Sequence, residues 1–487
     1  MTFRKVLIAN RGEIAVRVQG ACRELGIPTV AIYTEDDSDS LHVSRADEAI
    51  LVEPGPREGY LDPDQITEAA VRTGADAVHP GYGYLSEQPA LPLALRQRNI
   101  AFIGPSPRTI EVMGDNLTAR TVAESAGLPV VPASPALAGL RDAAQWADRI
   151  GYPVVLRARA AGEGRKCWKA GSAQALETAL RQTTPDDCGA DAGGRRIYLE
   201  KFVPEPKHIE IQVACDKRGN RVQLGERDCS IRRRNRKLIE ITPSLALGEK
   251  ARRDLGEAAL RLCAALEYDT VGGVEFLVDG DGRFFFSRMT TRLGTGHAVT
   301  ELVTGVDLVK EMIRAAAGQP LSFSREDVSP RGFAIECRIH AQDPRRNFSR
   351  STGRITRYLS PGGIGVRLDS SLHAGCEALA DVEPLISKLS VWGRDWDEAL
   401  ARMSRALHEY VIRGLQTTVP FCEKLVADPD FRAGRFTTHL MEEKIDAFRY
   451  PEPVEPLDPF FVSGAALFAH FLAGGLPTAS VHPGGEQ

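Results

Sequence analysis

The stretch Phe284 to His297, FFFSRMTTRLGTGH, runs from aromatic β-forming residues into a loop that contains Gly294 and Gly296. Enzymes of the α/β class usually place their acids and metal ligands where a strand ends beside such a loop. This loop instead offers Arg288 and Arg292, together with two threonines. No acidic residue is present in this stretch, so the chemistry of the site has to be sought elsewhere in the sequence.

A second basic stretch, Cys229 to Lys237, has the sequence CSIRRRNRK. A run of charge of this kind is often only a solvated face of a protein. Its last member, Lys237, either faces an anionic ligand or serves as an ion-pair partner that keeps the domain folded.

The elements that position these stretches alternate between strands and helices. The segments 5–9, 12–26 and 29–34 indicate a strand, a helix and a second strand, and the segment 75–83 ends a further strand in a glycine turn. This order predicts an α/β protein that opens with a doubly wound parallel sheet. The segment 152–198 combines a strand, a Gly/Ala-rich turn and a polar loop, which suits a small mobile lid.

The composition is that of an ordinary globular protein, with 43% hydrophobic and 26% charged residues among 487. A net charge of −4 argues against a general nucleic-acid binder. The N-terminus has too short an apolar run for a secretion signal, and no stretch approaches the roughly 20 apolar residues of a membrane span. These observations predict a cytoplasmic protein. The nine cysteines form no CxxC pair, which favours reduced thiols over a disulfide framework or a zinc site.

Six motifs follow one another along the chain: IANRGEIAVR, HPGYGYLSE, GERDCSIRRRNRK, GGVEFL, FAIECRIHAQDP and GGIGVR. In this order, over Phe3 to Ile445, the chain resembles biotin carboxylase, the ATP-grasp subunit of the biotin-dependent carboxylases. Members of that family use MgATP to activate bicarbonate as carboxyphosphate and then carboxylate the ureido nitrogen of biotin.

The resemblance implies an α/β, biotin carboxylase-like ATP-grasp fold with an N-terminal doubly wound parallel-sheet domain, a small lid and a C-terminal α+β domain. The implied divisions are 1–112 for the N-terminal domain, 113–203 for the first ATP-grasp half with its lid, 204–330 for the second half, 331–447 for the C-terminal domain, and 448–487 for a proline-rich linker, a helical piece and a tail.

The positions that hold phosphate in the family differ here. Arg157 stands for a lysine at the end of the lid strand, and Ala160 and Ala161 replace glycines of the phosphate cradle. Glu163 places a carboxylate in that cradle, where bare backbone amides would otherwise approach an anion. Asn116 replaces a further ATP-contacting lysine. These changes predict poor binding of MgATP.

The metal and base positions of the family differ as well. Arg288 stands for a carboxylate that bridges the metals, and Thr290 for an asparagine that helps to hold them, which leaves Glu275 as the only matching carboxylate ligand. Gly296 stands for the glutamate that deprotonates bicarbonate. We therefore expect no bound metal. Alternatively, Arg288 acts as a built-in cation that pairs with Glu275 and stabilises the fold without a ligand.

Other positions match the family, and they are Tyr82, Glu87, Glu200, Lys201, His208, Lys237, Arg292 and Arg338. The resemblance implies that Lys237, Arg292 and Arg338 face bicarbonate and the biotin enolate, with Tyr82 nearby. It also implies that Glu200, Lys201 and His208 belong to the nucleotide site.

This selective loss predicts a protein that no longer performs ATP-dependent carboxylation. Its retained cationic pocket would bind or transform a carboxylate-bearing or enolisable small molecule or acyl substrate, without ATP or any other cofactor. One alternative is a non-catalytic pseudo-carboxylase subunit or scaffold, and a second is an atypical biotin carboxylase of an acyl-CoA carboxylase.

The chain has no A-M-K-M type biotinylation motif, so any biotin must come from another chain. The predicted partners are therefore an anionic substrate, either a small molecule or carrier-bound, and a homodimer or a heteromer with carboxylase-type subunits. No nucleic acid and no membrane are expected.

Overall fold

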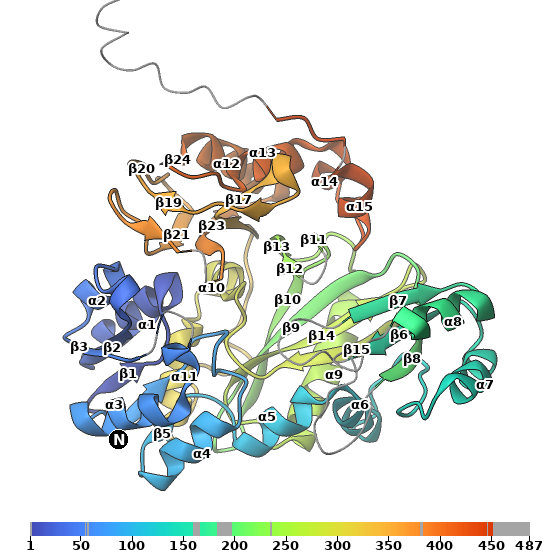
Figure 1. Ribbon diagram of the computed structural model, residues 1–487, viewed down its shortest axis with the longest axis horizontal. Coiled ribbons are helices and arrows are strands. Elements are labelled where there is room, and N and C mark those ends of the chain that lie inside the picture. Colours follow the sequence, from blue (N-terminus) through green and yellow to red (C-terminus); the bar gives the residue numbers. More distant parts are fainter. Residues whose placement is uncertain are drawn as a thin grey trace, which may run out of the picture. The chain divides into compact units, whose positions relative to one another are not determined.

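The computed structural model describes residues 2–53, 55, 58–158, 166–182, 197–233, 236–379, 383–445 and 447–450 (Figure 1). Residues 2–448 lie in one compact unit, and the chain beyond them forms a second. The predicted helical piece of the tail lies outside the described residues, as does Glu163. Every described helix is too short or too polar to cross a membrane.

The chain begins with a parallel sheet of five strands in the order β3-β2-β1-β4-β5. Its strands are β1 (Val6–Ile8), β2 (Thr29–Tyr33), β3 (Glu48–Leu51), β4 (Ala77–His79) and β5 (Ala101–Phe102). The connecting helices are α1 (Gly12–Glu24), α2 (Leu41–Arg45), α3 (Pro63–Thr73), α4 (Ala90–Gln97) and α5 (Pro107–Gly114). The three side chains of β1 have no exposed surface, as expected for a short apolar run in a parallel sheet. The predicted doubly wound opening domain is confirmed.

The turn after β4 places Tyr82. Gly81 has a φ of +62°, and an added Cβ would lie 2.8 Å from the Asn10 Nδ2 atom. Asn10 in turn donates from Nδ2 to the Pro80 and Tyr82 carbonyl oxygens at 2.7 and 2.9 Å. Glycine is therefore required where the turn passes close to Asn10.

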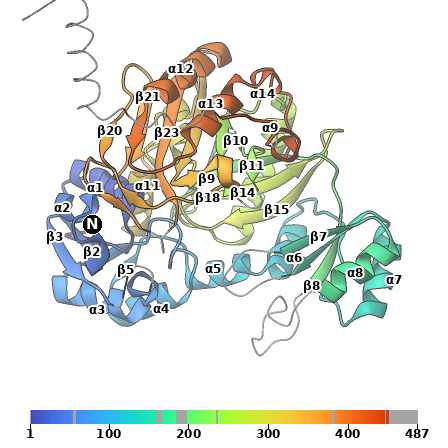
Figure 2. The same ribbon diagram turned by 45° about the horizontal axis from the view of Figure 1, so that its top comes forward.

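A three-stranded antiparallel sheet in the order β7-β6-β8 forms the lid. Its strands are β6 (Val154–Ala158), β7 (Lys166–Ala170) and β8 (Ile197–Lys201), and helices α7 (Leu140–Ile150) and α8 (Ala173–Gln182) pack on it (Figure 2). Along β6, Val154, Leu156 and Ala158 are buried among these helices, and Arg157 points away from that core because side chains alternate along a strand.

The largest sheet is antiparallel and has eight strands in the order β15-β14-β9-β10-β13-β16-β23-β21 (Figure 1). They are β9 (Lys207–Cys215), β10 (Arg221–Asp228), β13 (Ile239–Thr242), β14 (Val271–Val278), β15 (Phe284–Thr290), β16 (Phe333–His340), β21 (Val366–Ser370) and β23 (Leu385–Gly393). Four short ribbons accompany it: β11 (Arg232–Arg233) with β12 (Arg236–Lys237), β17 (Gln342–Asp343) with β18 (Ser349–Arg350), β19 (Gly353–Arg354) with β22 (Glu377–Ala378), and β20 (Arg357–Leu359) with β24 (Val411–Arg413). The remaining helices are α6 (Asn116–Ser125), α9 (Glu249–Ala265), α10 (His297–Thr304), α11 (Leu308–Ala316), α12 (Trp396–Glu409), α13 (Val419–Ala427), α14 (Pro429–Arg432) and α15 (Leu440–Lys444).

The two faces of this sheet differ in polarity. Ile209, Ile211 and Val213 of β9 pack into a core with residues of α6 and α9. The alternate residues His208, Glu210 and Gln212 are buried on the opposite face. Because side chains alternate along a strand, one face of the sheet is apolar and the other carries buried charge. The combination of a parallel opening sheet, a small lid and this large sheet is the ATP-grasp fold.

Candidate functional site

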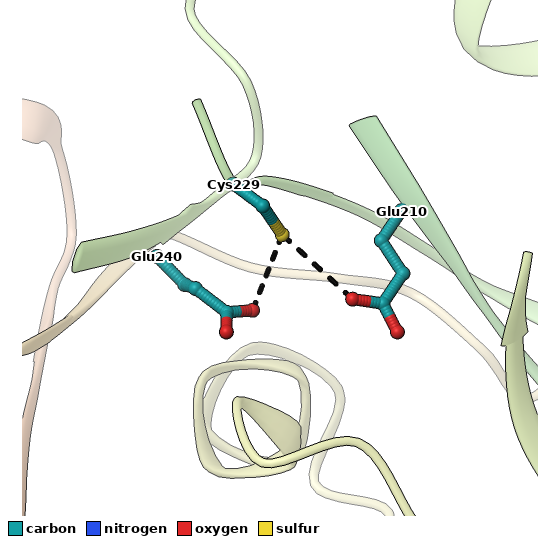
Figure 3. Close-up of side chains that lie close together, drawn as sticks. All are labelled: Glu210, Cys229 and Glu240. Atoms are coloured by element: carbon teal, nitrogen blue, oxygen red, sulfur yellow. Dashed lines mark hydrogen bonds between the residues drawn. The ribbon is translucent and has the colours of Figure 1, made fainter. Parts of the chain in front are cut away.

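Three buried acidic groups meet on the polar face of the large sheet (Figure 3). Glu210 comes from β9, Cys229 follows β10 directly, and Glu240 comes from β13, with ligand-type atoms within 4.8 Å of one another. The Cys229 Sγ atom lies 3.3 Å from the Glu240 Oε2 atom and 3.7 Å from the Glu210 Oε2 atom. Such a group has the residue types of a metal site.

Three cations already neutralise these carboxylates. Arg227 reaches Glu210 Oε1 at 2.8 Å and Glu240 Oε2 at 3.2 Å, and Lys237 Nζ reaches Glu210 Oε2 at 2.5 Å. Arg338 donates from NH2 to the other oxygen of Glu240. Lys237 Nζ also lies 3.4 Å from Glu275 Oε1, and Arg338 Nε lies 3.6 Å from Glu336 Oε1, so these cations and carboxylates form one buried network. Because its carboxylates already have cationic partners, the cluster suits an anion better than a metal ion.

The pKa values agree with this assignment. Burial disfavours the ionised form of Glu240, but Arg338, Lys237 and Arg227 lower its pKa to about 2. Burial also opposes protonation of Lys237, yet Cys229, Glu210 and Glu275 raise its pKa. Both groups therefore stay charged at neutral pH, so Glu240 is a weak proton acceptor that positions Arg338.

Glu240 fills the space beside Gly296. A Cβ added to Gly296 would lie within 3.0 Å of all three terminal atoms of the Glu240 carboxylate. The carboxylate of Glu240, which belongs to β13, therefore occupies the space that the Cβ atom of any side chain at residue 296 would need. This relation links residues that are far apart in the sequence, and the sequence analysis missed it.

Glu275 lies at a second centre, between β9 and β15. Its Oε1 atom accepts from Arg288 NH2 at 2.8 Å, from Thr290 Oγ1 at 3.0 Å and from Lys237 Nζ at 3.4 Å. Its Oε2 atom lies 2.6 Å from His208 Nε2. The alternative reading of Arg288, a cation paired with Glu275, therefore describes its contact correctly.

The pKa of Glu275 reflects these contacts. Burial opposes ionisation, but Arg288, Lys237 and His208 hold its pKa well below the usual range. Glu275 in turn raises the pKa of Arg288, whose side chain is 38% exposed and so reaches the surface of the site.

The family resemblance implies a magnesium ion near Glu275, and the residues here do not fit one. A carboxylate offers about four lone-pair positions, and four side chains already approach this one. A guanidinium about 4 Å from a divalent cation costs about 8 kcal/mol at an effective dielectric of ~20. Thr290 offers only a hydroxyl, which already donates to Glu275.

Two further arginines surround this centre. Arg157 of β6 pairs with Glu200 of β8, and Arg232 of β11 lies 3.0 Å from His208 Nδ1. Burial lowers the pKa of Arg232, Glu275 opposes that shift, and Arg288 and Arg157 add to it. Arg157 and Arg288 therefore both lie within electrostatic reach of Arg232, and we call these three residues the arginine cluster.

The structure places the remaining predicted nucleotide residues as follows. Lys201 donates from Nζ to the carbonyl oxygens of Gly151 and Tyr152 at 2.8 and 3.0 Å. Its side chain therefore holds the turn that precedes β6. Asn116 is the first residue of α6, which packs beside β15.

Arg292 and Tyr82 are tied to the N-terminal domain. Arg292 Nε lies 3.2 Å from Glu87 Oε2, and the Tyr82 hydroxyl donates to Glu13. Burial opposes protonation of Arg338, but Glu240 and other anionic groups raise its pKa, and Tyr82 contributes to that shift. Lys237 and Arg338 are thus joined through Glu240, whereas Tyr82 lies near Arg338 with its hydroxyl already bound.

The sequence analysis missed Glu210, Arg227, Glu240 and Glu336. Glu210, Glu240 and Glu336 lie inside largely apolar strands, Arg227 lies at the polar end of β10, and all four are fully or almost fully buried. A charged residue that recurs at every second position of an apolar strand is the signal that would have found them, because burial of charge requires partners.

Three family models match the chain in succession. The biotin carboxylase N-terminal domain matches residues 2–110, the carbamoyl-phosphate synthase L chain ATP-binding domain matches 115–324, and the biotin carboxylase C-terminal domain matches 336–443. Biotin carboxylase 1 of Bacillus subtilis is 44% identical over 443 residues, which cover 90% of this chain and 98% of that protein.

Solved structures agree. The biotin carboxylase domain dimer of the Hydrogenobacter thermophilus 2-oxoglutarate carboxylase, in complex with MgADP, ADP and bicarbonate, is 42% identical with a TM-score of 0.88, covering 93% of this chain and 100% of that one. The biotin carboxylase domain of a thermophilic 2-oxoglutarate carboxylase with ADP but without magnesium, in which the phosphate tail is disordered, is 44% identical with a TM-score of 0.81, covering 92% and 100%.

These relatives contradict two predictions from the sequence. They are named biotin carboxylases, and one of them binds MgADP and bicarbonate, so the prediction of a repurposed pseudoenzyme that needs neither ATP nor any cofactor is wrong. The prediction weighed each replaced side chain alone. In the folded site other strands bring charged groups to these positions: the Glu240 carboxylate fills the space beside Gly296, although it is a weak proton acceptor, and the arginine cluster carries charge suited to phosphate.

The order of the three domains and the identity to biotin carboxylases over nine-tenths of the chain lead to one conclusion: this chain belongs to the biotin carboxylase family.

Proposed function

We propose that this chain is the biotin carboxylase subunit of a biotin-dependent carboxylase. It uses ATP to activate bicarbonate and transfers the carboxyl group to biotin held by a separate chain. The observation that carries this proposal is the identity to biotin carboxylases over nine-tenths of the chain, together with the buried cations Lys237 and Arg338 that carboxylates hold in place. Buried cations with fixed positions suit a small monovalent anion such as bicarbonate.

Lys237 and Arg338 have the leading roles in this proposal. Glu240 and Glu210 hold the two cations in place before substrate arrives, so little reorganisation is needed when the anion binds. Arg292, held by Glu87, supplies a further donor from the loop after β15, and Tyr82 closes the site from the N-terminal domain.

ATP binds at the lid side in this proposal. Glu200 and Lys201 come from the lid strand β8 and His208 from β9 of the large sheet, and the arginine cluster faces the phosphates in this proposal. Asn116, at the start of α6, belongs to the same side. The residues of this chain orient the phosphates.

The names of the relatives support the proposed partners, since several are subunits of carboxylases. In this proposal a carrier delivers biotin and a further subunit selects the acyl substrate. The chain acts as a homodimer or in a heteromer with such subunits, in the cytoplasm, without nucleic acid or membrane.

The test measures ADP release from ATP by the purified chain, with free biotin in place of the carrier and with bicarbonate present or removed. ADP release should require both, and radioactive bicarbonate should enter acid-labile carboxybiotin. Lys237→Met should lower the rate about ten- to a hundredfold, because a charge-assisted hydrogen bond is lost.

The matched control is Lys250→Met, an exposed lysine on α9 that pairs only with Asp254. Absence of bicarbonate-dependent ADP release from the folded wild-type chain would contradict the proposal, as would equal rates for Lys237→Met and the control.

A further inference from the structure

The arginine cluster and Glu275 lie where the proposed function places the nucleotide phosphates. Arg288 faces Glu275 directly across the β14–β15 pair, and its guanidinium NH2 atom is 2.8 Å from Glu275 Oε1. His208, Lys237 and Thr290 occupy the other approaches to that carboxylate. The only carboxylate ligand that the family pattern leaves at this point is therefore committed to side-chain donors.

The positive charge at this point is permanent. An arginine stays protonated at every physiological pH, and Glu275 strengthens this by raising the pKa of Arg288. With 38% of its side chain exposed, Arg288 can donate to Glu275 from one edge and to a ligand from its other nitrogens, since a guanidinium has five donors in a fixed fork.

The neighbours of Arg288 indicate the kind of ligand. Arg232 of β11 lies within electrostatic reach of Arg288 and also of Arg157 of β6. Arg288 pairs with Glu275 and Arg157 with Glu200, and Arg232 brings a third guanidinium beside His208, so guanidinium groups from three strands gather here. Forked guanidinium donors match the oxygens of phosphate groups.

We infer that Arg288 replaces a protein-held magnesium ion, so that this chain binds the phosphates of ADP and ATP through side-chain cations and with little dependence on magnesium. The inference rests on the proposed function for the use of a nucleotide. It sets the chain apart from its relative, in which ADP without magnesium has a disordered phosphate tail.

The probe is ADP, titrated by calorimetry into the whole chain in EDTA and again in excess magnesium. The two dissociation constants should agree within about threefold. Arg288→Gln should weaken ADP binding in EDTA by about ten- to a hundredfold, because it removes charge-assisted hydrogen bonds. The loss should be smaller in magnesium, which then supplies the missing charge.

Two variants guard against a trivial outcome. Arg288→Lys keeps the charge beside Glu275 and should retain binding in EDTA, even if Arg288→Gln fails to fold. Arg283→Glu changes an exposed arginine that pairs with Asp279 just before β15, and it should bind ADP as the wild type does. Circular dichroism establishes that each variant is folded.

The results separate this inference from the proposed function. ADP binding that needs magnesium in the wild type, or that is unchanged by Arg288→Gln in EDTA, overturns the inference. Bicarbonate-dependent ATP cleavage in the same preparation then leaves the proposed function standing. Magnesium-independent ADP binding without any cleavage supports the inference and removes the proposed reaction. Failure to bind ADP under both conditions overturns both.

Discussion

Gly296→Ala should destabilise the protein far more than an ordinary exchange of glycine for alanine. The φ of −83° at Gly296 is open to any residue, so backbone strain plays no part. The cost comes from the space around it, since the new Cβ would lie within 3.0 Å of the Glu240 carboxylate. That carboxylate cannot move freely, because Arg227 and Arg338 hold both of its oxygens.

The magnitude follows from these contacts. To reach ordinary van der Waals distance, the carboxylate must shift by about 1 Å, which lengthens at least one ion pair. Overpacking in a core costs about 1–3 kcal/mol, and weakening a buried ion pair adds to this. We therefore expect the free energy of unfolding to fall by about 2–4 kcal/mol.

The assay is urea unfolding followed by tryptophan fluorescence. Gly248→Ala is the matched control, because Gly248 also caps a helix, α9, and an added Cβ there meets no atom within 4 Å. That variant should lose no more than about 1 kcal/mol, the usual cost of a poorer cap.

A double-mutant cycle with Glu240→Ala isolates the contact. Once the Glu240 side chain is removed, Gly296→Ala should cost only as much as the control, which gives a coupling energy of at least about 1 kcal/mol. The reasoning is refuted if Gly296→Ala is as stable as Gly248→Ala, or if its cost is the same with and without the Glu240 side chain.

Three further predictions concern the polar face of the large sheet. Burial raises the pKa of Glu336 from 4.5 to about 7, so between these values the folded state holds a proton that the unfolded state has released, and stability falls as pH rises. Glu336→Gln should remove up to about 3 kcal/mol of this decline between pH 5 and 8, and parallel profiles of the unfolding free energy against pH would contradict the assignment. Arg227→Met leaves two buried carboxylates with one partner fewer and should cost about 3–5 kcal/mol in urea unfolding, whereas a loss below 1 kcal/mol would show that the pair is not buried as described. Tyr82→Phe removes the donor to Glu13 and should cost about 1–3 kcal/mol, with an unchanged melting temperature as the contrary result.

The fold could largely be predicted because its signals are local. Apolar runs such as Val6–Ile8 and the aromatic start of β15 form strands where the pattern indicates them, and the glycine turn after β4 lies where HPGYG predicts it. Six motifs in one order then identified the family. Lys237 and Arg338, which match a motif one by one, lie in the buried charged network of the site, and their roles stay predictions.

The balance of charge in the site could not be predicted in the same way. Whether the missing side chain at Gly296 leaves empty space depends on Glu240, which belongs to another strand. Whether the charge of Arg288 is balanced depends on Glu275 across the β14–β15 pair. Single substitutions suggested a broken site, whereas the outcome depends on how strands distant in sequence share carboxylates and cations.

The pairing of β13 with β16 has a consequence for any attempt to work with fragments. Ile239 to Thr242 pair in register with Ala334 to Cys337, so the polypeptide on either side of position 330 contributes to one hydrogen-bonded sheet. A cut there would expose β13 and β16 as edge strands, whose unpaired amide and carbonyl groups can pair with strands of other molecules. The two halves should therefore aggregate when each is expressed alone and should fold only when they are expressed together. Recovery of activity on co-expression would then report that the two halves have reassembled.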